Sequence, residues 1–65
     1  MYTSLTNREL EIISHIINGD SNKQIADNLL ISVHTVKSNL ENIYRKIDVH
    51  NRVQVAVWAC KNNLG

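Results

Sequence analysis

Apolar residues recur along most of this chain at intervals of three and four positions, the period of an amphipathic helix. The pattern predicts four helices, at about residues 7–18, 22–29, 33–47 and 52–63. The third has the most regular stripe, formed by Val33, Val36, Leu40, Ile43 and Ile47. Proline is absent and glycine occurs twice, a composition that permits long helices and argues against a turn-rich β-fold. We therefore predict an all-α four-helix bundle.

Each predicted helix is preceded by a side chain that can cap its first turn. At the first, second and fourth helices a Glu or Gln follows three positions later, the pattern of a capping box. The four capping residues are Thr6, Ser21, Ser32 and Asn51. Gly19 ends the first helix, because glycine tolerates the left-handed conformation found there. We interpret residues 1–65 as one domain, with residues 1–5 as an N-terminal lead-in.

The second and third helices are separated only by Leu30-Ile31-Ser32. Two helices joined by such a tight turn form a helix-turn-helix, whose second helix enters the major groove of DNA. Ala26 is small where the two helices must approach closely, and apolar residues surround it. A generic helical hairpin shares part of this pattern, so the spacing alone leaves both interpretations open.

A series of short motifs over roughly residues 5–60 carries a family resemblance. They are Leu5-Thr6-x-Arg8-Glu9, Gly19, Asn22-Lys23-Gln24-Ile25-Ala26, Leu29-x-Ile31-Ser32, Thr35-Val36-Lys37, Lys46-Ile47-x-Val49 and Arg52. In order and spacing they resemble the LuxR/FixJ-type DNA-binding domain. The resemblance implies the output domain of a bacterial response regulator or ligand-sensing regulator. It also implies a dimer joined through the fourth helix, with the third helix in the major groove.

The sequence departs from that family at two positions of the third helix. Asn39 stands where the family usually has His, and Glu41 where some members have a basic or small residue that reads bases. A carboxylate repels phosphate but can accept a hydrogen bond from cytosine N4. We therefore do not carry over the family's base preference.

The polar face of the third helix, opposite its apolar stripe, is available to the groove. We expect Lys37 to contact a base, because its ammonium can reach guanine O6 or N7, and the resemblance implies the same. Thr35 and Lys23 lie in the first turns of their helices, where anions are favoured, so we expect them to contact phosphate. The predicted DNA-binding residues are Asn22, Lys23, His34, Thr35, Lys37, Ser38, Glu41 and Arg45.

The fourth helix has apolar residues on two sides. We expect one side to pack on the bundle, formed by Val53, Ala56, Val57, Cys60 and Leu64. The other side would then be exposed, and exposed apolar patches that contain Trp commonly mark interfaces. The predicted homodimer interface is formed by Val55, Trp58, Ala59 and Asn62. The alternative is that Trp58 folds back onto the core of its own domain.

Charge is uneven along the chain. The net charge is +1, but residues 1–20 carry one basic and three acidic residues (−2), whereas residues 21–52 carry five basic and three acidic residues (+2). Positive charge therefore gathers around the predicted DNA-facing helix, although an ordinary mixed surface would look similar. Cys60 is the single cysteine, which excludes an internal disulfide and is typical of the reducing cytosol. We expect a cytoplasmic protein.

Other classes of function find little support. The sequence has no nucleophile–base pair, paired carboxylates, phosphate-binding glycine loop or metal-ligand spacing, so we expect no enzyme, cofactor or metal. No apolar run approaches the ~20 residues that cross a bilayer. Two alternatives stay open: the promoter-recognition region of a sigma factor, which has a similar pattern, and a protein-interaction module that has lost DNA binding. RNA polymerase is a further candidate partner.

Overall fold

The computed structural model describes residues 5–64, which form four helices and no strand. The helices are α1 (Asn7–Ile17), α2 (Asn22–Leu29), α3 (Val33–Ile47) and α4 (Arg52–Lys61). The all-α prediction is confirmed, and α2 and α3 have the predicted bounds. Helix α1 ends one residue earlier and α4 two residues earlier than predicted. Most of the predicted lead-in, residues 1–4, lies outside the described range.

The predicted caps are all present. Thr6 and Ser21 each accept from the backbone N–H three residues on, and Glu9 and Gln24 return the bond, so both capping boxes are complete. Ser32 and Asn51 cap α3 and α4 in the same way, without the reciprocal bond. The box expected at α4 is incomplete, because Gln54 Oε1 accepts from the backbone N–H of His50 at 2.6 Å instead. Gly19 has a φ of +86°, the left-handed conformation expected at the end of α1. The ends of the helices are therefore fixed by local chemistry.

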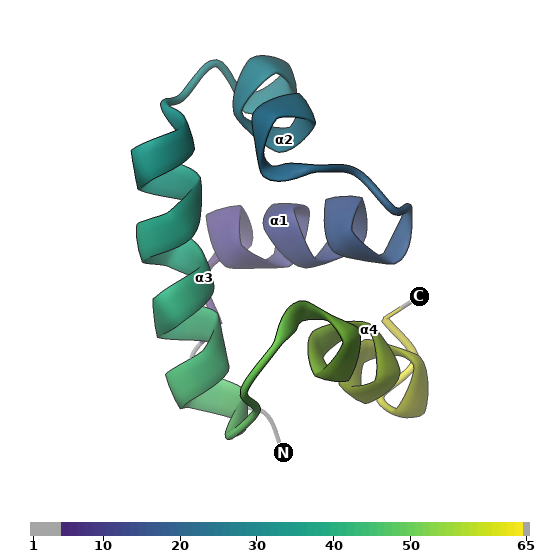
Figure 1. Cartoon of the computed structure of the whole chain (residues 1–65). Coiled ribbons are helices and arrows are strands. Elements are labelled where there is room, and N and C mark those ends of the chain that lie inside the picture. The colour runs from purple at the N-terminus through teal and green to yellow at the C-terminus, as the bar shows by residue number, and fades with distance from the viewer. Residues whose placement is uncertain (1–4, 65) are drawn as a thin grey trace.

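Helix α1 lies across the middle of the bundle, with α2 and α4 on opposite sides of it, and α3 runs along one side (Figure 1). The core lies where the four helices meet. It consists of Ile12, Ile13, Ile16, Ile25, Ala26, Val36, Leu40, Ile43, Ile47, Val55 and Ala59. All the predicted α3 stripe is buried except its first member, Val33. Burial of this stripe turns the opposite, polar face of α3 to solvent.

The connection between α2 and α3 is the tight turn that the sequence predicts. Leu30 caps α2 in the left-handed conformation, with φ of 59°, and its exposed side chain packs on nothing. The next residue, Ile31, donates its backbone N–H to the carbonyl of Ala26 at 3.0 Å. Ser32 then starts α3 at once. This turn sets α2 and α3 as a helix-turn-helix pair.

The prediction for the two faces of α4 is wrong for most of its residues, although Ala56 and Leu64 pack against the core as expected. Val55 and Ala59, expected at a dimer interface, are both 0% exposed and belong to the core. Val53 and Val57, expected in the core, are 69% and 48% exposed, and Cys60 is exposed as well. Helix α4 packs mainly against α1, and the one-turn pair of Val55 and the small Ala59 provides the buried stripe. Apolar residues surround α4, so its sequence has no polar face to mark the solvent side.

A polar contact joins α1 to α3 beside the core. Glu9 is only 3% exposed, and its Oε1 accepts from Lys46 Nζ at 2.8 Å as well as from the backbone N–H of Thr6 at 2.9 Å. Burial by itself raises the pKa of the Glu9 carboxyl. The bonds from Lys46 and Thr6, with the charge of Lys46, outweigh burial and hold that pKa below its ordinary value. This ion pair fixes the C-terminal half of α3 on α1.

Candidate nucleic-acid interface

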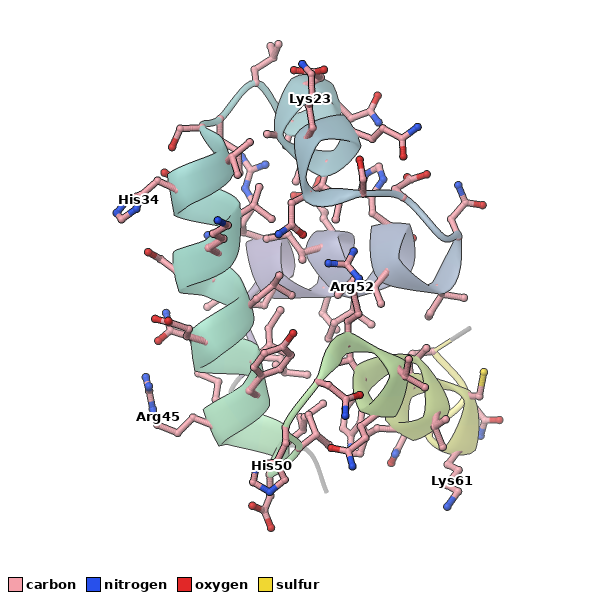
Figure 2. All side chains as sticks on the ribbon, in the orientation of Figure 1. Lys23, His34, Arg45, His50, Arg52 and Lys61 are labelled. Atoms are coloured by element: carbon pink, nitrogen blue, oxygen red, sulfur yellow. The ribbon has the colours of Figure 1, made fainter. Side chains whose placement is uncertain are left out.

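The exposed side of α3 carries six of the eight residues that the sequence predicts to bind DNA. All six are exposed, and Figure 2 shows His34 and Arg45 pointing away from the bundle. They are His34, Thr35, Lys37, Ser38, Glu41 and Arg45. The buried stripe on the other side of α3 is what holds them outward. This face follows the tight turn directly, as the second helix of a helix-turn-helix requires.

Within residues 5–64, no hydrogen bond or ion pair is made by the side chains of His34, Lys37, Ser38 and Glu41. Their polar groups are therefore free to bind a ligand. Thr35 is engaged locally, because its hydroxyl lies 2.9 Å from the hydroxyl of Ser32. Arg45 Nη2 donates to Asn42 Oδ1 at 2.6 Å. Side chains in the middle of the face thus have no partner, whereas Thr35 and Arg45 bond to residues on or next to α3.

Lys37 and Glu41 give the centre of this face both signs of charge. They are one helical turn apart, yet no ion pair joins them. Arg45 is one turn beyond Glu41 and bonds to Asn42 instead. The carboxylate therefore stands between two cations and is held by neither. A uniformly basic patch would be typical of nonspecific phosphate binding. Mixed charge is better suited to discriminating between base edges.

The start of α2 carries the remaining two predicted residues. Lys23 Nζ lies 3.5 Å from Asp27 Oδ2, and both side chains are more than two-thirds exposed. Exposed pairs of this kind contribute little, so Lys23 can exchange partners at small cost. Asn22 is half-buried, and its Oδ1 accepts from Arg52 Nη1 at 2.7 Å. No local spacing in the sequence indicates that Asn22 and Arg52, 30 positions apart, are partners.

Exposed apolar side chains gather on α4, on the side opposite the buried stripe. Val53, Val57 and Cys60 fall within about 60° of arc at about 100° per residue. Next to Val57, a hollow lies between α4 and the α3–α4 connection, lined by Ile47, Asp48, Val49, His50, Gln54, Val57, Trp58 and Lys61. Of the predicted interface, Trp58 and Asn62 are half-buried: Trp58 packs partly on the core, and Asn62 Nδ2 donates to the Trp58 carbonyl at 2.8 Å.

The sequence pattern described as "Bacterial regulatory proteins, luxR family" matches residues 3–59. This match covers most of the chain and agrees with the helix order and the turn described above. The chain belongs to the luxR family. The family assignment also decides between the two resemblances that the sequence left open, in favour of the LuxR type over the sigma-factor type. We refer to the chain below as the LuxR-type domain.

The LuxR-type domain is similar to transcription regulators from distant bacteria. It is 48% identical over 63 residues to the transcriptional regulatory protein LiaR of Bacillus subtilis, covering 97% of this chain and 30% of that protein. It is 48% identical over 58 residues to the CsgBAC operon transcriptional regulatory protein of Escherichia coli, covering 89% of this chain and 27% of that protein. The chain thus spans less than a third of the length of these relatives.

A solved structure has the same fold. It is the response regulator ChrA of a heme-sensing two-component system, with a TM-score of 0.91 and 38% identity, covering 100% of this chain and 32% of that one. Between residues 5 and 64, no helix of the LuxR-type domain is long and apolar enough to cross a membrane. In the same range, no three His, Cys, Asp or Glu side chains gather into a group able to hold a metal ion.

Proposed function

We propose that this LuxR-type domain binds double-stranded DNA in a sequence-specific way as the output part of a bacterial transcription regulator. The observation that carries the proposal is the exposed polar face of α3, which directly follows the helix-turn-helix turn and has no internal partners at its centre. The similarity to regulators such as LiaR and ChrA supports it. In this proposal α3 enters the major groove and the start of α2 crosses the backbone.

The residues of the interface have distinct tasks in this proposal. Lys37, in the centre of the α3 face, contacts guanine, and Ser38 lies beside it. Thr35 and Lys23 contact phosphate near the first turns of α3 and α2, where the helix dipole favours an anion. His34 and Arg45 flank the groove-facing centre and add contacts to the backbone.

The second part of the proposal is that two copies bind together through α4. Val53 and Val57 are exposed in the single chain, and burying them against a second copy would remove apolar surface from water. This face replaces the one built on Val55 and Ala59. Symmetric pairing would present two α3 helices to half-sites about one DNA turn apart.

Selection from a pool of random duplexes tests the DNA-binding proposal. Bound duplexes are sequenced, and the affinity of the enriched sequence is then titrated against salt. We expect a motif of two half-sites, with log affinity falling linearly as log salt rises. Lys37→Ala should relax the base preference at one position of each half-site, and Lys23→Ala should weaken binding to all sequences alike.

Arg8→Ala is the matched control, because it removes the same charge from an exposed side chain of α1. It should leave the motif unchanged. Failure of the unaltered domain to enrich any sequence, or to bind even at low salt, would contradict DNA binding. That result would favour the protein-interaction module, for which Glu41 on the exposed face is the main argument.

A further inference from the structure

Arg52, the first residue of α4, bridges this helix to the start of α2. Its Nη1 donates to Asn22 Oδ1 at 2.7 Å, and its Nη2 donates to the backbone carbonyl of Asp20 at 2.7 Å. Figure 2 shows Arg52 reaching from the start of α4 towards the segment that leads into α2. A cation in the first turn of a helix is unfavourable for the helix dipole. The two bonds to another element compensate for this position.

The same short segment is also held from the end of α1. The Asp20 carboxylate lies 2.7 Å from His15 Nδ1 and accepts from Asn18 Nδ2 at 3.2 Å. Ser21 then caps α2 with a complete capping box. The start of α2 is therefore fixed by the end of α1 on one side and by Arg52 on the other. A side chain that is already held in place loses little conformational entropy when it binds a ligand.

The contact with Arg52 determines which way the Asn22 amide points. A guanidinium has only donors, so it must face the oxygen of the amide, and the NH₂ group points away from it. Within residues 5–64 this NH₂ group has no acceptor. Asn22 is the first residue of α2, where the backbone N–H groups and the dipole already favour an anion. A phosphate oxygen is the acceptor that fits this position.

We propose that Arg52 is a positioning residue for DNA binding, which holds the Asn22 amide with its NH₂ group directed at a DNA phosphate. The inference rests on the proposed function and assigns it a residue that does not itself touch DNA. It also gives α4 a second task, because the helix proposed to join two copies begins at the residue that orients the backbone contact.

A double-mutant cycle tests whether Arg52 acts through Asn22. The unaltered domain, Asn22→Ala, Arg52→Lys and the double variant are titrated with the selected duplex, at a temperature where circular dichroism finds all four folded. Lysine keeps the charge but lacks the planar fork with which the guanidinium makes both bonds. We expect Asn22→Ala to bind about tenfold more weakly and Arg52→Lys to lose a similar amount. The double variant should bind no more weakly than Asn22→Ala, because the second change then has nothing left to disturb.

Asn22→Asp separates the positioning role from a merely structural one. The carboxylate still accepts from Arg52, and a negative charge suits the start of a helix, so the melting temperature should stay or rise. It has no NH₂ group to donate, so DNA affinity should fall at least as far as in Asn22→Ala. Losses that multiply in the cycle, or an Asn22→Asp variant that binds like the unaltered domain, would overturn the inference alone. An unaltered domain that does not bind DNA would overturn the proposed function with it.

Discussion

Among the eight residues predicted to bind DNA, Glu41 is the only carboxylate. Its carboxylate lies at the centre of the exposed face of α3, one turn from Lys37, and no other residue in the range 5–64 binds it. Near phosphates a free carboxylate costs binding energy unless it finds a donor. The cytosine N4 amino group is such a donor in the major groove. We therefore expect Glu41 to favour half-sites that have a cytosine at the position it contacts.

We expect Glu41→Ala to remove a preference for cytosine at one position of each half-site and to leave the position read by Lys37 unchanged. A good base contact contributes about 1–3 kcal/mol of discrimination, so the loss should be roughly tenfold or more at that position. Sequencing the selected duplexes measures it. Glu11→Ala, the same charge change on α1, is the control. Tighter binding to every sequence with an unchanged motif would mean that Glu41 only repels phosphate.

Glu9 makes the stability of the domain depend on pH. The pKa of Glu9 is lowered in the folded chain, so at low pH the folded chain binds fewer protons than the unfolded chain does. The stabilisation is complete at neutral pH and is lost as the pH falls below about 4.3, the ordinary value for glutamate. Glu9→Gln should reduce the free energy of unfolding by about 1–2 kcal/mol at pH 7 and flatten its decline in acid. Urea unfolding at a series of pH values measures both effects. Glu11→Gln, in an exposed pair, should change the pH 7 value little, and an equal loss in that variant would contradict the assignment.

At the scale of elements, α2 and α3 were predictable to the residue because their ends depend on neighbours in the sequence. Ser21 and Ser32 form their caps with residues three positions away. The α3 stripe is equally local, since only one side of that helix is apolar. Leu30 ends α2 in the left-handed conformation that glycine usually supplies, so no glycine marks this end in the sequence.

Helix α4 could not be oriented from its sequence because both of its sides are apolar. Only packing on α1 selects the stripe of Val55 and Ala59, and that choice depends on the shape of a surface far away in the sequence. By size alone Trp58 is the best candidate of α4 for the core, yet it is only half-buried, whereas Val55 and the small Ala59 are fully buried.

The same substitution on the two sides of α4 distinguishes them. Val55→Ala should lower the free energy of unfolding by about 2 kcal/mol, because it removes fully buried methyl groups and leaves a cavity. Val53→Ala, at a side chain that is 69% exposed, should change it by less than about 0.5 kcal/mol. Urea unfolding of both variants at low protein concentration provides the comparison. Equal losses would contradict the assignment of the buried face.

At the scale of the whole molecule, the sequence predicted the exposed polar side of α3 but not the contacts that hold it in place. The face follows from a local period, as does the turn before it. The bonds of Lys46 to Glu9 and of Arg52 to Asn22 join residues 37 and 30 positions apart. No local pattern identifies such partners, because a charged or amide side chain on a helix surface can bond to water as well as to a distant residue. The exposed face of α3 was therefore predictable from the sequence, whereas the long-range bonds behind it were not.

In the proposed function one α3 helix contacts few base pairs, so pairing of two copies would determine the affinity for a site with two half-sites. Val57→Glu places a charge in the proposed interface at a side chain that is 48% exposed in the single chain, so the fold should tolerate it. We expect binding to an isolated half-site to stay unchanged, while the advantage of two correctly spaced half-sites falls at least tenfold. Leu10→Glu, at a side chain 37% exposed on α1, is the matched control and should keep that advantage.

The thiol of Cys60 reports on the same interface directly. It is exposed in the single chain and lies on the side of Val53 and Val57. Pairing through α4 should therefore slow its reaction with a maleimide when the two-site duplex is bound, but not when a single half-site is bound. Val57→Glu should abolish this protection. Equal reaction rates on both duplexes in the unaltered domain would place the contact between copies elsewhere, since no pairing through this side of α4 can leave its only thiol equally accessible.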